Sequence, residues 1–519
     1  MSLTKPKLSL SQRWRIDKLI TAAKGNPNKP QSVQMSIPYL AMYPDGVCEV
    51  TDRLYSKTIE FADRSYELDS QEEQTATFEN LCNLYNYFDP SISVQQTFIN
   101  RHVAKDELHQ AVYMPLSNDD QLNHNREEYN DIIRGQLEKN NCLARTKHLT
   151  FAIEADSLKQ AKSRLDKIEK DILNHFKRIG TTAKILNGKE RLAVLHNMLH
   201  LGTTEPFAFE WDWLAQSGMS TKDYIAPTSF YFGEGRNFRI GGKIGAVSYL
   251  QILAPELNDR ILTDFLKINE NMVVNLHFRS IDRNNALQMV KRKITDLNSM
   301  KIDHQQKAVS NGFDMDIMPT DLATYGDEAK KLLQDLQNRN EKMFLLTVTI
   351  LNIAGSKQAL EDKIFQLSGI AQEHNCALHR LDYMQEQGLM SSLPLGLNQI
   401  PIQRGLTTSG LAIFMPFVTD EIFSGAEALY YGYNPISGNP IMLDRKQLTN
   451  QNGLYLGIPG SGKSASAKNE IYNIILRTSD DIAILDAESE YAPIVRELKG
   501  QVIRISQNST DFINPMGAT

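Results

Sequence analysis

The sequence predicts an α+β N-terminal region followed by an incomplete α/β, RecA-like P-loop domain. Two observations lead to this fold class. Three segments, which begin at Leu149, Val273 and Leu346, each contain an alternating strand, a polar turn and an amphipathic helix. Near the end of the sequence, GIPGSGKS fits the phosphate-binding pattern G-x-x-x-x-G-K-[ST].

A single strand–helix unit cannot bury both of its faces, so we expect the three units to pair into ferredoxin-like β-α-β layers. The length of 519 residues is enough for several domains. We predict four parts: a basic leader (1–35), an N-terminal α+β domain (36–215), a second α+β region with a helical hairpin at 284–340 (216–425) and the start of a RecA-like P-loop domain (426–519).

The leader combines positive charges with one aromatic residue, Trp14; the basic residues are Lys5, Lys7, Arg13, Arg15 and Lys18. Such a tract could dock on anionic lipid or nucleic acid. It could equally be a solvated tail. Because it contains no apolar run, we do not expect a signal peptide.

Further strands are predicted along the chain. PYLAMYPDGVCEVTDRLYSKTIEF indicates a hairpin with Pro44, Asp45 and Gly46 at its turn, and SISVQQTFINR and CALHRLDYM also indicate strands. GEGRNFRIGG lacks the G-x-G-x-x-G spacing of a dinucleotide-binding loop and lies between strand-like runs. We therefore interpret it as a hairpin turn.

The tract from 284 to 337 is strongly helical and is broken near NGFDMDIMPTDLATYG, which predicts a projecting helical hairpin. The break contains Asp314, Asp316 and Asp321. The EF-hand spacing fails, because no Gly stands at the sixth position and no Glu at the twelfth. We expect these carboxylates to cap helices and solvate a loop.

Composition excludes several other classes of protein. The net charge of −6 argues against a basic nucleic-acid-binding chain. The cysteines, Cys48, Cys82, Cys142 and Cys376, are scattered, which favours a reducing compartment over a disulfide framework or a zinc site. The histidines show no H-E-x-x-H spacing. The longest apolar stretch, MFLLTVTILNIAG, is too short to span a bilayer, so we expect a soluble chain.

Within the phosphate-binding pattern, each residue type has a chemical reason. Gly457 and Gly462 let backbone N–H groups curve around phosphate oxygens without a Cβ clash. Lys463 brings a positive charge to the β- and γ-phosphates, and the Ser464 hydroxyl can bind Mg²⁺. The preceding GLYLG predicts a strand and the following SASAKNEIYNIILR a helix, whose N-terminus would face the anion.

DIAILDAESEY predicts an apolar strand that ends in Asp486, with Glu488 and Glu490 after it. It is similar to the strand whose Asp holds Mg²⁺ in P-loop enzymes. However, only one helix separates Lys463 from Asp486, so we prefer to place Asp486 at the end of the second strand. A simpler sheet, in which Asp486 does hold Mg²⁺, stays open. APIVRELKG predicts a helix with Gly500 as its C-cap, and QVIRIS another strand.

These stretches resemble a known family. YYGYNPISGNPIMLDRKQLTNQNGLYLGIPGSGKSASAKNEI, followed by LDAESEY and FINP, resembles the VirB-type, TraC-like ATPases of conjugative type IV secretion, a HerA/FtsK-like branch of P-loop motors. PLGLN and RGLTTSGLAIFMPF are also similar to that family, and the resemblance is strongest from about Ile402 onward. It implies that Asp486 and Glu490 belong to a D-x-x-x-E-Y segment on the second strand. It also implies a set of residues that bind ATP and Mg²⁺: Gly457, Gly460, Ser461, Gly462, Lys463, Ser464 and Ala465.

The resemblance further implies a cytoplasmic motor, peripheral to the inner face of the cell membrane, that powers channel or pilus assembly and DNA–protein transfer. Its partners would be other type IV secretion components at the inner membrane and further copies in a hexamer, with indirect or no DNA contact. Family members continue beyond this length, so we expect a truncated P-loop domain whose later catalytic residues lie elsewhere. Two alternatives remain: a DNA-pumping coupling protein, which usually has N-terminal membrane helices, and a non-enzymatic docking module.

Overall fold

The structure is a computed structural model of the chain. It describes residues 32–102, 112–117, 122–137, 143–203, 205–253, 258–310, 329–337, 340–418, 423–424, 427–434, 439–448, 450–506, 509 and 511. The basic leader up to residue 31 and the loop with Asp314, Asp316 and Asp321 lie outside these ranges.

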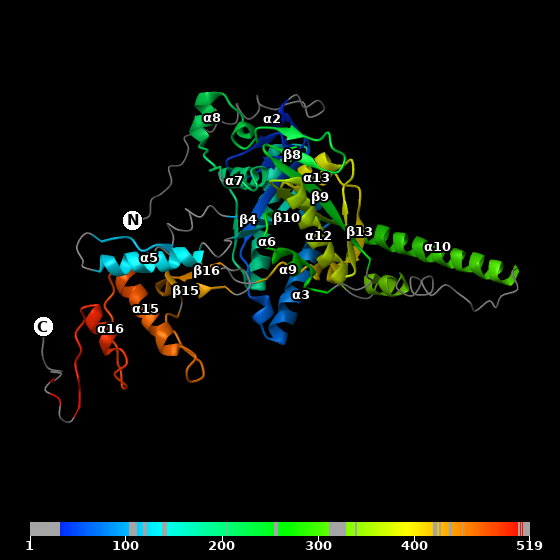
Figure 1. Cartoon of the computed structure of the whole chain (residues 1–519). Coiled ribbons are helices and arrows are strands. Elements are labelled where there is room, and N and C mark those ends of the chain that lie inside the picture. The colour runs from blue at the N-terminus through cyan, green and yellow to red at the C-terminus, as the bar shows by residue number, and fades with distance from the viewer. Residues whose placement is uncertain are drawn as a thin grey trace. The chain divides into compact units, whose positions relative to one another are not determined.

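The chain forms two compact units (Figure 1). The first, here called the sheet unit, comprises residues 1–102 and 143–420, and the second, the P-loop unit, comprises 103–142 and 421–519. Segment 103–142 therefore belongs with the C-terminal part of the chain. This differs from the sequence-based division, which placed that segment in the domain 36–215.

The sheet unit is built on one large antiparallel sheet, and its first half is a strand–helix–strand–strand–helix–strand repeat. The order of strands in space is β6–β3–β5–β4, and the short strands β1 and β2 extend the sheet from β3. The elements of this first repeat are β1 (Ala41–Met42), β2 (Cys48–Glu49), β3 (Leu54–Phe61), α3 (Gln71–Tyr87), β4 (Ile92–His102), β5 (Leu143–Glu154), α6 (Leu158–Ile179) and β6 (Ala183–Ile185).

The second half of the sheet repeats the same arrangement. The order in space is β12–β9–β11–β10, and β7 and β8 extend the sheet from β9 as β1 and β2 do from β3. The elements of this second repeat are β7 (Phe230–Tyr231), β8 (Phe238–Ile240), β9 (Lys243–Ile252), α9 (Ile261–Leu266), β10 (Met272–Ser280), β11 (Met343–Ala354), α12 (Lys357–Glu373) and β12 (Cys376–Arg380).

The two repeats meet edge to edge, because β4 pairs antiparallel with β10 over a register in which Thr97 lies opposite Asn275. Both repeats are also interrupted at the same point, the connection between their second and third core strands. In the first repeat this connection is 103–142, which enters the P-loop unit. In the second it contains α10 (Arg283–Ser310), which extends away from the sheet and packs against the helical residues 329–337 (Figure 1).

Local sequence explains why these elements form. α6 buries residues three or four apart, begins at Ser157, whose side chain accepts from the Gln160 N–H, and ends at Gly180 with a φ of 88°. The predicted hairpin at Pro44-Asp45-Gly46 is confirmed: Gly46 has a φ of 85°, and a Cβ there would overlap the Leu186 carbonyl oxygen. The predicted turn in GEGRNFRIGG is confirmed as well, since β8 and β9 pair across Gly241 and Gly242.

The remaining elements of the sheet unit surround this sheet. β13 pairs with β11, and α13 packs against β9, β10 and β11. Their bounds are α2 (Val33–Ser36), α7 (Gly188–Leu199), α8 (Trp211–Ser217), α13 (Gln385–Ser392), β13 (Arg404–Thr407) and α14 (Thr408–Ala412). Throughout the described part of the chain, the helices are too short or too polar to cross a bilayer.

In its described residues, the P-loop unit contains a small sheet of order β14–β16–β15, three α-helices and the 3-10 helix η3 (Arg445–Gln447). Its apolar cluster joins Val112 and Ile133, from segment 103–142, to Ala428 and Met442. The segment that leaves the sheet unit thus supplies part of this core. The elements are α5 (Asn123–Leu137), β14 (Phe423–Ser424), β15 (Leu429–Tyr433), β16 (Pro440–Leu443), α15 (Lys463–Arg477) and α16 (Ala492–Glu497).

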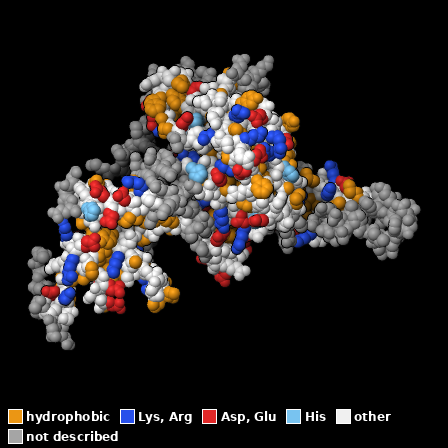
Figure 2. All heavy atoms as spheres, viewed as in Figure 1, with side chains coloured by type: hydrophobic (Ala, Val, Ile, Leu, Met, Phe, Trp, Pro, Cys, Tyr) orange, Lys and Arg blue, Asp and Glu red, His pale blue; other side chains and the backbone are white. Residues whose placement is uncertain are grey.

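Three predictions for the P-loop unit were wrong. GLYLG, DIAILDA and QVIRIS, predicted as strands, are not paired with any strand among the described residues. Several of their apolar side chains are exposed, Leu454 at 80% and Leu485 fully, because an extended segment buries its apolar face only when neighbouring strands or helices cover it. Figure 2 shows hydrophobic side chains on the surface around α15 and α16.

The predicted C-cap at Gly500 also requires correction. The residue with left-handed backbone is Lys499, at a φ of 62°. Gly500 instead donates its N–H to the Val495 carbonyl oxygen, and a Cβ at Gly500 would press on the Val495 side chain. Here glycine is required by close approach rather than by its φ angle.

Candidate phosphate-binding site

The predicted phosphate-binding loop turns sharply into α15. Residues 459–462 form turns, and the Ser461 N–H donates to the Ile458 carbonyl oxygen over 3.2 Å. Gly460 and Gly462 have φ angles of 81° and 91°, a region in which a side chain is strained. An added Cβ would meet nothing within 4 Å at either position, so backbone conformation, and not space, requires glycine there.

Gly457 serves a different purpose in the same loop. A Cβ built on Gly457 would overlap the Ser461 hydroxyl and come within 3.3 Å of the Lys463 side chain. The absence of a side chain therefore lets the two ends of the loop approach each other. Loops of this type bind phosphate through their backbone N–H groups.

Lys463 already lies across this loop. Its Nζ donates hydrogen bonds to the carbonyl oxygens of Gly457 at 2.7 Å and Ile458 at 3.2 Å. These neutral acceptors hold the ammonium where a phosphate would lie. An incoming phosphate oxygen can take over such a bond as a stronger, charge-assisted one.

The first turn of α15 leaves its backbone N–H groups available for an anion. It contains Lys463, Ser464 and Ala465 and no acidic residue, and its N-cap, Gly462, offers no side-chain acceptor. The helix dipole therefore favours negative charge at this end, and the first turn itself supplies no carboxylate to compensate it. Ser464 is half-buried beside Lys463, the position from which a hydroxyl would hold Mg²⁺.

Glu470, which was not predicted from the sequence, holds the segments around the loop together through hydrogen bonds. Its carboxylate is buried in α15 and accepts hydrogen bonds from the Tyr431 hydroxyl at 2.7 Å, from Arg445 at 2.9 Å and from the Tyr455 hydroxyl. Burial, followed by the bond to Glu470, raises the pKa of Tyr455 to about 12. Because Tyr455 precedes the loop and Glu470 follows it, this cluster joins both sides of the turn to β15.

Segment 103–142 holds the other end of the same helix. Arg126 is buried and donates from Nε to the Leu476 carbonyl oxygen at 2.9 Å. Arg477 donates to the Val112 carbonyl oxygen at 3.0 Å. In the last turn of α15, where unpaired carbonyls accumulate, the Leu476 carbonyl is thus satisfied by Arg126 of α5, and Arg477 ties the same turn to Val112. Figure 1 shows α5 beside α15.

Asp486 lies in the turn before α16. Its carboxylate accepts from the backbone N–H groups of Tyr491 at 2.8 Å and Glu488 at 3.1 Å, and the first of these bonds is the main reason why the pKa of Asp486 is lowered. Lys468 of α15 lies over the Tyr491 ring at 5.4 Å. Asp486 thus shapes a turn next to α15, whereas the side chains of Glu488 and Glu490 are exposed.

The structure brings the predicted loop residues together and adds Glu470, Arg126 and their partners. The sequence signal for these additions was weak: Tyr431 lies in the run YYGY, and Arg126 lies in an ordinary polar helix more than three hundred residues away. No protein-family model matches the chain, and a search of the curated proteins finds no match.

Proposed function

We propose that this chain carries the ATP-binding part of a motor of conjugative type IV secretion, joined to a large sheet unit that docks on the secretion channel. The observation that carries the nucleotide-binding half is the loop from Gly457 to Ser464. Its left-handed glycines, its inward lysine and a helix N-terminus without acidic residues together form a phosphate site. The resemblance of the surrounding motifs supports the conjugative role.

In this proposal Lys463 binds the β- and γ-phosphates of ATP after it leaves the Gly457 and Ile458 carbonyls. The backbone N–H groups of residues 460–465 surround the phosphates, and the Ser464 hydroxyl would hold Mg²⁺, which neutralises charge between the β- and γ-oxygens. The hydrogen bonds of Glu470 stabilise the conformation of the loop. Asp486 shapes the turn before α16.

The sheet unit supports the docking half of the proposal. Its repeats, with strand orders β6–β3–β5–β4 and β12–β9–β11–β10, are consistent with the expected ferredoxin-like units. They form one continuous sheet that needs no residue of the P-loop unit for its pairing. In the proposed assembly, this unit lies at the inner face of the membrane against other secretion components, and copies of the chain form a ring.

Nucleotide binding gives the direct test. The purified chain should bind a fluorescent ATP analogue in the presence of Mg²⁺, and Lys463→Ala should weaken binding by at least about tenfold, the equivalent of one charge-assisted hydrogen bond. The matched control is Lys468→Ala, which removes a lysine from the same helix five residues further on. Equal binding by the wild-type chain and Lys463→Ala would refute the nucleotide site.

A second candidate, a non-enzymatic docking module, is favoured by one observation. The segments on both sides of the loop expose Leu454, Leu456 and Leu485, and no strand among the described residues pairs with them. Phosphate release separates the two candidates. A motor releases phosphate from ATP at a rate that Lys463→Ala abolishes, whereas a docking module binds its channel partner equally well with or without Lys463. A DNA-pumping coupling protein would add DNA-dependent stimulation.

A further inference from the structure

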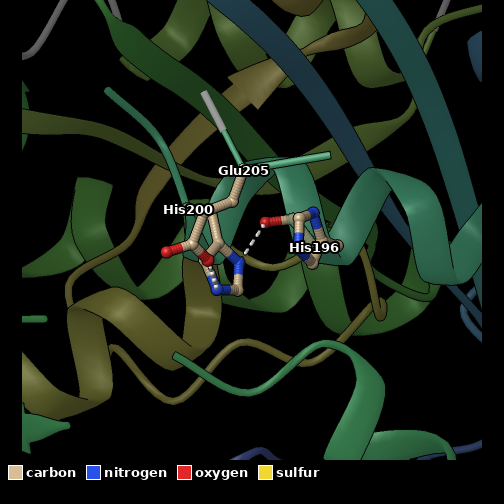
Figure 3. Close-up of side chains that lie close together, drawn as sticks. All are labelled: His196, His200 and Glu205. Carbon is tan, nitrogen blue, oxygen red and sulfur yellow. Dashed lines mark hydrogen bonds and ion pairs between the residues drawn. The ribbon is translucent and has the colours of Figure 1, made fainter. Parts of the chain in front are cut away.

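A second cluster of functional side chains lies in the sheet unit, at the end of α7. His196 and His200 are one helical turn apart, and Glu205 follows in the next loop (Figure 3). One possible ligand atom from each residue lies within 4.8 Å of the others. The two imidazole rings stack at a centroid distance of 4.0 Å with 19° between their planes.

His196 has an unsatisfied ring nitrogen. The residue is only 5% exposed, and its Nδ1 has no hydrogen-bond partner among the described residues. A neutral imidazole is the form that binds a metal ion.

His200 is oriented as a metal ligand usually is. Its Nδ1 lies 3.0 Å from the His196 carbonyl oxygen (Figure 3), and when Nδ1 carries the proton it donates to that oxygen and Nε2 can bind a metal ion. That Nε2 lies 3.3 Å from a carboxylate oxygen of Glu205. The His200 side chain is 10% exposed and the Glu205 side chain 62% exposed, so the cluster is accessible to solvent from the Glu205 side.

We propose that His196, His200 and Glu205 bind one Zn²⁺ ion. Two imidazole nitrogens and one carboxylate oxygen form a donor set that suits Zn²⁺ and not Mg²⁺ or Ca²⁺, which prefer oxygen ligands. Zn²⁺ bonds of about 2.0–2.1 Å require the ligand atoms, now within 4.8 Å of one another, to approach, and the stacked imidazole rings to rotate so that one nitrogen of each points at the ion. The fourth position stays with water.

The surroundings show which parts of the fold such an ion would connect. α7 is anchored by Arg191, a buried guanidinium that donates to the carbonyl oxygens of Gly46, Ser56 and Pro394. The ion would join the end of this anchored helix to Glu205 in the loop that follows.

Metal titration of the full chain, without a polyhistidine tag and after dialysis against chelator, tests the proposal. We expect one equivalent of Zn²⁺ to bind, Co²⁺ to give the visible absorption of a four-coordinate site, and the melting temperature to rise on metal addition. His200→Gln should weaken Zn²⁺ affinity by more than about 100-fold, which exceeds the usual 10–100-fold effect of an outer-shell residue.

Glu205→Gln is the second variant, since its exposed side chain can be changed without disturbing the core. It should weaken Zn²⁺ affinity and alter the Co²⁺ spectrum. Two controls should bind like the wild type: His379→Gln, an exposed histidine of β12, and Lys463→Ala, which separates this inference from the nucleotide proposal. Failure of the wild-type chain to bind Zn²⁺, or unchanged binding by both His200→Gln and Glu205→Gln, would overturn the proposal.

Discussion

The Tyr129 hydroxyl donates a hydrogen bond of 2.7 Å to the Asn473 amide oxygen, which joins α5 to the middle of α15. Asn473 is buried, and Tyr129 is half-buried, with its pKa raised to about 12 mainly by burial. The bond lies on the helix that begins at the phosphate-binding loop. Segment 103–142 is thus part of the support of the candidate site.

Replacing Tyr129 by Phe should destabilise the P-loop unit. The Asn473 oxygen would lose this donor in a buried position, at a cost of about 1–3 kcal/mol. Urea unfolding, followed by fluorescence, measures the loss. Tyr383→Phe, an exposed tyrosine of the sheet unit, should leave the midpoint unchanged. An unaltered midpoint for Tyr129→Phe would show that α5 does not support α15 in solution.

Glu470→Gln should weaken both the fold and nucleotide binding. The substitution removes the negative charge that receives Arg445 and the hydroxyls of Tyr431 and Tyr455. Charged hydrogen bonds of this kind contribute about 1.5–3 kcal/mol each, so a loss of a few kcal/mol is expected. Glu488→Gln, in an exposed position, is the control. If Glu470→Gln bound nucleotide like the wild type, the cluster would have no part in shaping the loop.

Gly462→Ala should weaken ATP binding by roughly tenfold or more. Left-handed backbone costs a residue with a Cβ about 1–2 kcal/mol, and relaxation would move the loop away from the phosphates. The comparison is Gly369→Ala in α12, where a Cβ meets nothing within 4 Å and alanine favours the helix by up to about 1 kcal/mol. That variant should bind like the wild type and melt slightly higher. Equal affinities for the Gly462 variant and the wild type would contradict the left-handed conformation.

The sheet unit should lose stability as the pH falls. Burial is the main cause that lowers the pKa values of His148 and His277 to about 4. Between the ordinary pKa of about 6.5 and this value, the unfolded chain binds more protons than the folded one, so stability is complete above pH 6.5 and is lost toward pH 4. Each histidine should cost about 2 kcal/mol between pH 7.5 and pH 5.

A substitution isolates the contribution of His277 to this loss of stability. His277→Gln can still donate to the Ser391 carbonyl oxygen, which His277 contacts at 2.8 Å, but it does not titrate. Its unfolding free energy should therefore fall about 2 kcal/mol less than that of the wild type over the same pH range. His379→Gln, an exposed histidine, should follow the wild type. Parallel pH curves for His277→Gln and the wild type would refute the assignment.

Local structure in the sheet unit was predictable because its signals lie close together in the sequence. The hairpin at Gly46, the turn at Gly241-Gly242 and the strand–helix segments from Leu149 and Leu346 follow from alternation, turn residues and helix caps. The junction of β4 with β10 was not predictable, since any apolar edge strand satisfies the same pattern. That segment 103–142 belongs to the P-loop unit was also not predictable, because no local sequence signal indicates it.

The residues of the candidate site were also predictable from the sequence only in part. The loop residues from Gly457 to Ser464 follow a fixed spacing that a sequence can show. Glu470 could not be selected among the acidic residues, because its three donors come from β15, from the turn after β16 and from the segment before the loop. The prediction of strands beside the loop was wrong for a related reason. Alternating apolar residues give a segment strand propensity, but it forms a paired strand only where a neighbouring strand is available.

Segment 103–142 has a consequence for the order in which the protein is made. His102 and Leu143 lie opposite each other in β4 and β5, so this hairpin can close soon after synthesis of its strands. Val112 and Ile133, however, find their core partners Ala428 and Met442 only roughly 300 residues later, or about 15–60 s at 5–20 residues per second. During that interval their apolar side chains lack these partners. The nascent chain should therefore engage ribosome-associated chaperones through this segment until the P-loop unit has been translated.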